Sequence, residues 1–432
     1  MKKTHPESLM MSYGYQPKQS AGAIKAPLFQ TSTFAFQSAE EGKAFFEVAY
    51  GLREKQPDEE MGMIYSRINN PNLEILEQRL SLWDKADQCA VFQSGMAAIS
   101  TVMLEFLKPG DLVLFSQPVY GGTDHFINYC LKDMNVDSIG FTADQSFDEI
   151  IDLVENSGKA DRLSLIYVES PANPTNDLFD IEMCSAIKSY FETKDKKIFL
   201  AVDNTFMGPV WSSPLELGAD LVIYSATKYI GGHSDLIAGA VLGDAETMIR
   251  IKTLRTFLGN MASPHTCWLL MRSLETLKVR MEQQARNAQA IAKFLNNHPI
   301  VKKVHYLGLL DKDSKDYSIF KKQYTSPGAM IAFEIDGNES EAFRFLNHLQ
   351  LIKLAVSLGS TESLVQHPAS MTHAGMDPEL RDKIGITESL IRLSVGLENH
   401  EDLIRDIVNA LEMVKSENNS INTLERQLVK AY

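Results

Sequence analysis

One lysine in the sequence is surrounded by residues that would make its side-chain amine reactive. Lys228 lies in the stretch SATKYIGGHSD, residues 225–235, directly after the apolar run ADLVIY. A lysine at the end of a buried strand is poorly hydrated, which disfavours its ammonium form and lowers its pKa. A neutral amine can form a Schiff base with an aldehyde, and the hydroxyls of Ser225 and Thr227 can meet a phosphate. An aldehyde that carries a phosphate describes pyridoxal 5′-phosphate (PLP), whereas an ordinary surface lysine is the simpler reading of this stretch alone.

The apolar runs of the sequence place this lysine in an alternating series of strands and helices. Five short runs are typical of buried strands: residues 88–93, 111–117, 163–169, 198–204 and 219–225. Segments with helical periodicity lie between or before them, namely residues 72–83, 96–107 and 180–194. This pattern predicts a mostly parallel α/β sheet covered on both faces. Ligands of such sheets bind beyond the carboxyl ends of the strands.

Each predicted strand end is followed by a group that suits one part of PLP. Gly95 and Met96 open a helix whose N–H groups and dipole can hold a phosphate. Tyr120 can stack on a planar ring, and Asn173, with prolines close on both sides, can hydrogen-bond a ring hydroxyl. Asp203 ends a buried strand, where a carboxylate is costly unless it is paired.

A protonated pyridine nitrogen would pair Asp203 and keep the ring an electron sink. Each of these groups also has a structural explanation on its own: a strand–helix turn, a core tyrosine, a proline-rich turn and a helix N-cap. Their order, with one group per strand end, favours the PLP interpretation.

The chain is long enough for two or three packed domains. Residues 1–62 predict an extended arm without sustained helical or strand period, in which residues 51–62 form an exposed charged loop. Residues 63–262 predict the large PLP-binding domain, and residues 263–432 a smaller C-terminal α/β domain. In the smaller domain we expect a long helical stretch at 267–298, strands at 328–336 and 390–396, and helices at 341–349 and 401–416.

Charge and cysteine usage exclude several classes of protein. The formal net charge of −14 argues against nucleic acid as a partner. The four cysteines form no CxxC pair and no His/Cys ligand spacing, so we expect no metal site and a reducing, cytoplasmic location. The first residues lack the apolar region of a secretory signal, and no apolar run approaches the roughly 20 residues of a membrane helix.

Six motifs resemble those of the cysteine/methionine-metabolism PLP enzymes, from about residue 27 to about residue 411. They occupy residues 65–72, 169–176, 202–206, 225–235, 357–373 and 392–398. This family includes cystathionine γ-synthase, cystathionine γ- and β-lyases, methionine γ-lyase and O-acylhomoserine sulfhydrylases. The resemblance implies the aspartate-aminotransferase-like PLP-dependent transferase fold type I. It also implies a homotetramer built as a pair of dimers.

The resemblance assigns roles to cofactor-binding residues. It implies that Lys228 forms the Schiff base and carries protons, that Asp203 partners the pyridinium nitrogen, and that Tyr120 stacks on the ring. The phosphate would be held by Gly95, Met96, Ser225 and Thr227.

The resemblance also assigns residues at the edges of the site. Tyr65 and Arg67 would reach the phosphate of the neighbouring subunit. Arg392 and Ser357 would bind the substrate α-carboxylate, a role that suits a bidentate guanidinium.

The chain departs from the family pattern at positions that bear on the substrate. Methionine γ-lyases typically carry a cysteine where this chain has Gly122, and a Lys-Asp pair where it has Arg255-Thr256. Cystathionine γ-lyases typically carry a glutamate where it has Val356, which predicts an apolar distal pocket. The acidic segment 48–62 is long and is expected near the site entrance.

These observations predict PLP-dependent γ-elimination or γ-replacement on sulfur-containing or O-acylhomoserine-type amino acids. A cystathionine β- or γ-lyase, which releases pyruvate or 2-oxobutyrate, is the alternative, and a non-catalytic PLP-binding protein is a further one. A nucleotide-binding oxidoreductase is disfavoured because no GxGxxG follows an early strand.

Overall fold

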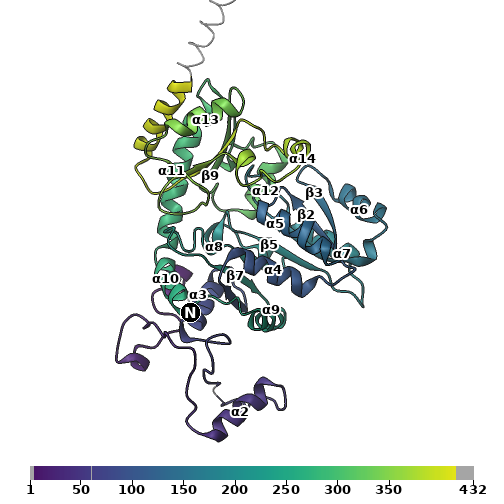
Figure 1. The fold of residues 1–432 in the computed structure, drawn as a ribbon, viewed down its shortest axis with the longest axis vertical. Coiled ribbons are helices and arrows are strands. Elements are labelled where there is room, and N and C mark those ends of the chain that lie inside the picture. Colours follow the sequence, from purple (N-terminus) through teal and green to yellow (C-terminus); the bar gives the residue numbers. More distant parts are fainter. Residues whose placement is uncertain (1–3, 60, 415–432) are drawn as a thin grey trace, which may run out of the picture.

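A seven-stranded sheet forms the centre of the molecule (Figure 1), which is described by a computed structural model over residues 4–59 and 61–414. Its strands lie in the order β1 (Gln88–Phe92), β7 (Gly239–Gly243), β6 (Leu221–Tyr224), β5 (Phe199–Asp203), β4 (Leu163–Glu169), β2 (Leu112–Gln117) and β3 (Asp137–Thr142). β7 is antiparallel to both of its neighbours, whereas β6, β5, β4, β2 and β3 are parallel to one another. The mostly parallel sheet predicted from the sequence is therefore confirmed, with β3 and β7 as strands that the sequence analysis did not identify.

Helices cover both faces of this sheet because its strands are apolar on both sides. α4 (Gly95–Phe106) and α9 (Ala245–Leu258) pack on one face, and α6 (Phe147–Asn156) and α7 (Ile181–Phe191) pack on the other. In β5, Phe199 and Ala201 face the first pair of helices, while Leu200 and Val202 face the second. Two shorter helices, α5 (Gly121–His125) and α8 (Gly208–Trp211), follow β2 and β5. Their placement leaves the carboxyl ends of the strands accessible to a ligand.

The predicted helical stretch 267–298 is two helices rather than one. α10 (Pro264–Leu274) ends before Thr276, whose φ of −114° and ψ of 5° are not helical, and α11 (Leu277–Asn296) begins after it. The buried Arg280 donates from Nη2 to the carbonyl of Ser273, 3.1 Å away, and so takes up an acceptor in the last turn of α10. This side-chain contact lies at the break, and periodicity alone gives no sign of it.

A second sheet of five strands lies in the C-terminal part of the described chain (Figure 1). Its order is β10 (Lys353–Leu354), β11 (Leu364–Gln366), β12 (Leu390–Ser394), β9 (Met330–Ile335) and β8 (Val301–His305). The accompanying helices are α12 (Lys315–Gln323), α13 (Glu339–His348), α14 (Pro378–Lys383) and residues 400–414. The strands predicted at 328–336 and 390–396 and the helix predicted at 341–349 are thus present. The last two residues of the helix predicted at 401–416 lie outside the described residues.

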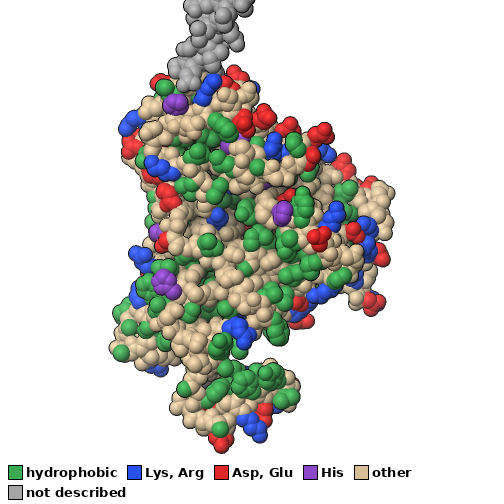
Figure 2. Space-filling view, in the orientation of Figure 1, with side chains coloured by type: hydrophobic (Ala, Val, Ile, Leu, Met, Phe, Trp, Pro, Cys, Tyr) green, Lys and Arg blue, Asp and Glu red, His purple; other side chains and the backbone are tan. Residues whose placement is uncertain are grey.

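The N-terminal arm contains two α-helices that the sequence analysis did not predict. α1 (Pro6–Leu9) packs on α3 (Pro71–Asp84), whereas α2 (Ala39–Ala49) projects away from the body of the molecule (Figure 1). The excursion that carries α2 is closed by pairing of Thr33 with Tyr65. Its aromatic side chains contact one another, and Figure 2 shows hydrophobic side chains gathered on this projecting segment. The charged residues 51–59 and 61–62 lie in a loop, as predicted, and Arg53 ties it to Glu47 and Glu59.

Within the described residues, no helix combines the length and the apolar character that crossing a membrane requires. The same residues contain no group of three or more His, Cys, Asp or Glu side chains arranged to hold a metal ion.

Candidate active site

A cavity of about 250 Å³ lies at the carboxyl ends of the large-sheet strands. Every residue that the sequence predicted to contact PLP within one subunit lines this cavity: Gly95, Met96, Tyr120, Asn173, Asp203, Ser225, Thr227 and Lys228. These residues come from five separate segments of the chain. The parallel sheet brings them together because its strand ends meet at one edge.

Lys228 lies in the turn that follows β6, with its amine directed at a serine hydroxyl. Its Nζ donates to Ser357 Oγ at 2.7 Å. Burial, together with the nearby Arg392 guanidinium, lowers the pKa of Lys228 to about 8. The amine therefore has a larger neutral fraction near neutral pH than an ordinary lysine, as its sequence context predicts.

Ser357 connects Lys228 with the predicted carboxylate-binding arginine. Its carbonyl accepts from Arg392 Nη2 at 2.9 Å, while its hydroxyl accepts from the lysine. Ser357 has a φ of 95°, a conformation that costs a non-glycine residue roughly 1–3 kcal/mol. The surrounding contacts hold Ser357 in this strained conformation, which fixes the Lys228 amine and the Arg392 guanidinium relative to each other.

Arg392 is buried and its guanidinium has partners on several sides. Nη1 donates to Asn173 Oδ1 at 2.8 Å. With its amide oxygen turned toward the cation, Gln366 places that oxygen 3.1 Å from both Nη1 and Nη2. Near-equal distances to the guanidinium nitrogens mean that Gln366 lies over the face of the group, which leaves in-plane N–H donors for a carboxylate. Burial lowers the pKa of Arg392 to about 10, so it remains a cation at neutral pH.

Asp203 is a buried carboxyl without a cationic partner among the described residues. Its Oδ1 accepts from the Thr205 N–H at 3.0 Å, and its Oδ2 accepts from the Tyr167 hydroxyl at 3.2 Å. Burial raises the pKa of Asp203 because no positive charge compensates for the loss of solvent. A cationic ring nitrogen in the cavity would supply the missing charge.

The start of α4 has the features of an anion-binding site. Ser94 Oγ accepts from the Ala97 N–H at 3.0 Å, so it does not cap the preceding N–H groups of Gly95 and Met96. A Cβ on Gly95 would lie 2.8 Å from the Cβ and Oγ of Ser225. Glycine at this position thus lets the helix N-terminus approach the turn that carries Ser225.

Tyr120 lies at the mouth of the cavity, directly before α5. Its side chain is 43% exposed, which leaves one side of the ring free for a ligand. A Cβ on Gly122 would lie 2.6 Å from Tyr120 Cε1 and 3.3 Å from Met96 Sδ. The absence of a side chain at Gly122 therefore lets the tyrosine ring occupy this space.

Two polar residues of the cavity, and one polar residue beside it, escaped the sequence analysis. Glu169 is the last residue of β4 and lies beside Asp203 in the strand register. Its carboxyl accepts from the N–H groups of Tyr120 and Asn173. Thr205, which bonds Asp203, and Gln366, which lies on Arg392, were also missed. The strand-end rule that identified Asp203 would have identified Glu169, but no local pattern indicates Gln366.

Tyr65 and Arg67 are not brought into the Lys228 cavity by the folding of their own chain. They line a neighbouring hollow with Met261 and with Ile237, which borders both spaces. Arg67 Nη1 donates to the Thr256 carbonyl at 3.1 Å, and its guanidinium lies 5.5 Å from the centre of the Tyr65 ring. Both side chains are thus held at the surface beside the cavity.

The departures from the family pattern have structural consequences. Arg255 is directed into the protein, where it pairs with Glu77, so it does not project toward a ligand. Val356 is 57% exposed and does not line the cavity. The apolar lining comes instead from Met96, Phe206, Leu358 and neighbouring residues.

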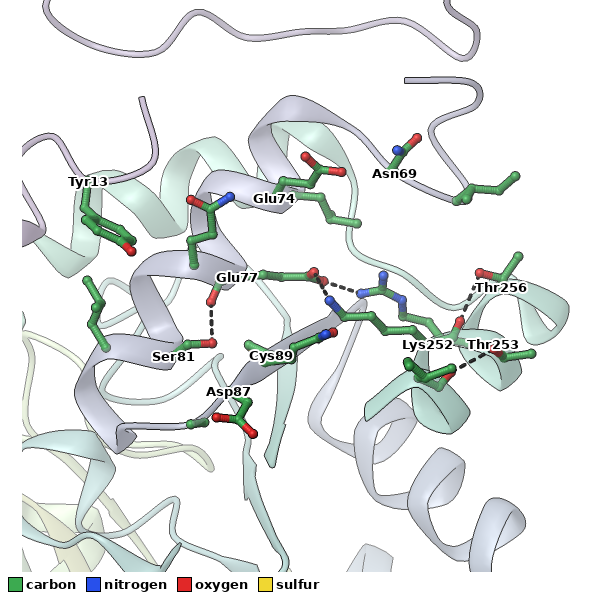
Figure 3. Close-up of a pocket in the computed structure, with 18 of the residues that line it drawn as sticks. Tyr13, Asn69, Glu74, Glu77, Ser81, Asp87, Cys89, Lys252, Thr253 and Thr256 are labelled. Carbon is green, nitrogen blue, oxygen red and sulfur yellow. Dashed lines mark hydrogen bonds and ion pairs between the residues drawn. The ribbon is translucent and has the colours of Figure 1, made fainter. Parts of the chain in front are cut away.

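A larger cleft, of about 830 Å³, lies between α3 and α9 (Figure 3). The charged groups at its centre are paired with one another. Glu77 forms one ion pair with Arg255 and a second with Lys252, whose Nζ lies 3.1 Å from the carboxylate. None of the residues predicted to bind PLP lines this cleft. Size therefore does not mark the reactive site in this molecule.

The chain matches the family of Cys/Met metabolism PLP-dependent enzymes over residues 7–412. The chain belongs to this family. It is 40% identical to the L-methionine gamma-lyase of Pseudomonas putida, over 93% of this chain and 95% of that protein. It is 37% identical to the cystathionine gamma-lyase of Bacillus subtilis, over 94% of this chain and 99% of that protein. A cystathionine gamma synthase structure from Xanthomonas oryzae superimposes with a TM-score of 0.84 and 30% identity, covering 96% of this chain and all of that one.

Family membership establishes the fold as PLP-dependent fold type I and PLP as the cofactor. The side chains present fit that cofactor. Asp203 has no cationic partner among the described residues and could pair with the ring nitrogen. The start of α4 has uncapped N–H groups for the phosphate, and Lys228 has an amine of lowered pKa for the aldehyde. The resemblance seen in the sequence motifs and the expectation of a PLP enzyme are both confirmed.

Proposed function

We propose that this enzyme catalyses γ-elimination, or γ-replacement by a thiol, on sulfur-containing or O-acylhomoserine-type amino acids. The observation that carries the proposal is the Ser357 bridge, which joins the Lys228 amine to the Arg392 guanidinium through two hydrogen bonds. This bridge places a proton carrier beside a carboxylate receptor, as the chemistry of an α-amino acid requires. The methionine and cystathionine lyases among the relatives support the substrate class.

The cofactor would be held by Lys228, Asp203 and the phosphate-binding residues at the start of α4 and in the Ser225 turn. When bound, PLP withdraws electrons from the substrate Cα and so acidifies the protons on Cα and Cβ. Asp203 would keep the ring nitrogen protonated, Asn173 would contact the ring hydroxyl and Tyr120 would cover one face of the ring. The Thr227 hydroxyl donates to the Ala238 carbonyl at 3.1 Å. This hydrogen bond would hold the turn at residues 225–228 in place beside the phosphate.

The residues around the substrate would bind it and move its protons. Arg392 would bind the α-carboxylate through its free in-plane donors, and Tyr120 would take a proton from the incoming amine. Lys228 would remove the Cα proton, with Ser357 orienting its amine. Loss of a proton from Cβ then allows the Cγ–S bond to break, and the electron pair leaves with sulfur. For methionine and water, the balanced products are 2-oxobutyrate, ammonia and methanethiol.

The cavity lining favours an apolar side chain over a charged one. Met96, Phe206 and Leu358 supply hydrocarbon surface near Lys228. This surface suits a methionine-, homocysteine- or acylhomoserine-sized group better than the charged far end of cystathionine. Gly122 offers no thiol beside Tyr120, so we expect γ-elimination that is slow or broad in substrate range. Cystathionine cleavage by β- or γ-elimination is the alternative function.

A second subunit would complete the site. Tyr65 and Arg67 lie at the surface, and the α2 segment that precedes them projects from the body of the molecule (Figure 1). We infer that they reach the phosphate of a neighbouring subunit in a homotetramer built from two such dimers. The two sheets support a large domain at 63–262 and a small domain at 263–432, preceded by the arm at 1–62. The cysteines of the described residues are all free, which supports a reducing cytoplasmic location.

The test is a substrate panel assayed in deuterated water. Methionine, homocysteine, O-acetylhomoserine and cystathionine are incubated with the holoenzyme, and 2-oxobutyrate, pyruvate and thioether products are quantified. We expect 2-oxobutyrate from the γ-substituted substrates, with deuterium entering at Cα and Cβ. Pyruvate as the sole oxo acid, without Cβ exchange, would replace this proposal with a β-lyase.

A further inference from the structure

We propose that Glu169 is a positioning residue that fixes Tyr120 and Asn173 relative to each other. Tyr120 would cover the cofactor ring, and Asn173 holds the Arg392 guanidinium. This inference rests on the proposed function, because it assumes that Tyr120 contacts the cofactor and that Arg392 receives the substrate carboxylate. Glu169 belongs to neither of those contacts. Its role would be to set the distance between them.

The geometry of the carboxyl supports this role. Glu169 Oε2 accepts from the Tyr120 N–H at 2.8 Å, and Oε1 accepts from the Asn173 N–H at 2.9 Å. The two N–H groups belong to loops that follow different strands, β2 and β4. One carboxyl therefore joins the two loops at the edge of the cavity.

Glu169 is itself held by the sheet. It is 5% exposed and ends β4, next to Asp203 in β5. Its own N–H donates to Ser116 Oγ at 2.9 Å, which ties it to the end of β2. Glu169 is thus anchored to two strands of the sheet, β4 and β2. Its carboxyl in turn fixes the two loops through hydrogen bonds to their N–H groups.

The effect of Glu169 extends to the substrate receptor through Asn173. The N–H of Asn173 is held by Glu169, and its side-chain oxygen accepts from Arg392 at 2.8 Å. A shift of the Asn173 backbone would therefore move the arginine as well as the ring contact. This chain of contacts predicts that one substitution at Glu169 disturbs both cofactor environment and substrate binding.

A carboxylate suits this position better than an amide. Both of its oxygens accept, so it satisfies two N–H donors at once. A glutamine of the same shape would turn its NH₂ group toward one of those donors and leave an N–H unpaired. Burial and the neighbouring Asp203 raise the pKa of Glu169 to about 8, while the N–H groups of Tyr120 and Asn173 favour its charged form and oppose that rise. The two hydrogen bonds that the Glu169 carboxyl accepts offset part of the free-energy cost of burying it.

Glu169→Gln tests the proposal, with Glu192→Gln as the matched control. Glu192 also accepts a backbone N–H, that of Ile198 at 3.1 Å, but it is not part of the cavity lining. For Glu169→Gln we expect a changed circular dichroism signal in the cofactor absorption band. We also expect a KM for the amino acid raised by roughly 10-fold to 100-fold, since small misplacements cost that much in oriented sites. Glu192→Gln should match the wild type in both readouts.

Ser116→Ala provides a milder second variant in case Glu169→Gln does not fold. Loss of the Ser116 hydroxyl frees the Glu169 N–H without touching the carboxyl, so the same two readouts should change in the same direction by a smaller factor. An unchanged cofactor-band signal with an unchanged KM in the folded variants would overturn the proposal. A wild-type holoenzyme that turns over no amino acid would instead refute the proposed function, and the cofactor-band signal would still test the link from Glu169 to Tyr120.

Discussion

Two clusters of buried charge, one around Lys228 and one around Glu77, differ in how their charges are compensated. In the larger cleft, burial opposes ionisation of Glu77, but Arg255 and Lys252 outweigh it and lower the pKa of its carboxyl (Figure 3). In the smaller cavity, burial lowers the pKa of Lys228 and raises the pKa of Asp203 and Glu169. Compensated charges stabilise a fold, whereas uncompensated ones are available for a ligand. The cavity with the incomplete charges, rather than the larger one, is therefore the reactive site.

The largest expected effect comes from removing the amine. Lys228→Ala should lower turnover by roughly 1000-fold or more, because covalent attachment and proton transfer both depend on it. The phosphate contacts remain, so the variant should still bind PLP, as measured by absorbance after gel filtration. Lys252→Ala, in the larger cleft, should keep most of the activity. Near wild-type turnover by Lys228→Ala would show that the two clusters have been assigned the wrong way round.

Neutralising one carboxyl in each cluster should separate stability from function. Glu77→Gln should lower the free energy of unfolding by roughly 3–5 kcal/mol, because it leaves the buried Arg255 guanidinium without its charged partner. Asp203→Asn should leave the stability of the cofactor-free protein within about 1 kcal/mol, since burial raises the pKa of Asp203 and the charged form that the substitution removes is already costly. It should nevertheless remove most of the activity. Urea unfolding monitored by circular dichroism, alongside turnover, measures both effects, and equal losses of stability would contradict the comparison.

Arg67 tests whether the Lys228 cavity is completed by another subunit. Arg67→Ala should weaken PLP binding by roughly 10-fold, the value of one charge-assisted contact. Fluorescence titration of the cofactor-free protein measures this constant, with the exposed Arg405→Ala as control. Mixing Arg67→Ala with Lys228→Ala subunits should restore part of the activity if sites are shared. A fully active monomer in sedimentation would rule out sharing.

A further prediction concerns acid stability near the cavity. Burial, with Arg392 nearby, lowers the pKa of His373 to about 4, while the unfolded chain keeps a value near 6.5. Between these values the unfolded state binds more protons, so stability falls as pH drops from about 6.5 to 4, by on the order of 3 kcal/mol. His373→Asn should flatten this part of the curve of unfolding free energy against pH, and the surface variant His400→Asn should not. Parallel curves for both variants would contradict the assignment.

Strand-end reasoning predicted the parallel sheet and the residues on it because apolar runs and polar strand ends are local features of the sequence. Asp203, Tyr120 and Lys228 each follow such a run, and the fold brings them to one cavity. Strand-end reasoning could not predict contacts between residues that are far apart in the sequence. Arg280 of α11 donates to the last turn of α10 at the break in the predicted long helix, and Gln366 lies on Arg392 from the neighbouring strand of the second sheet. Helix α2 was missed because its aromatic side chains pack on one another rather than on a core.

The direction of a side chain was equally hidden from the sequence. Arg255 stands at a position that suggests contact with a ligand, yet it points inward to Glu77. Val356 suggested an apolar pocket but lies at the surface. Both outcomes depend on packing between elements that are far apart in the chain.

Reduction of the PLP-loaded protein with sodium borohydride, followed by peptide mass spectrometry, tests the central assignment most directly. Reduction fixes the pyridoxyl group to the lysine that holds it. The account predicts one label per chain, carried by the peptide that contains Lys228. A label on Lys252, or on any other lysine, with Lys228 unmodified would contradict it.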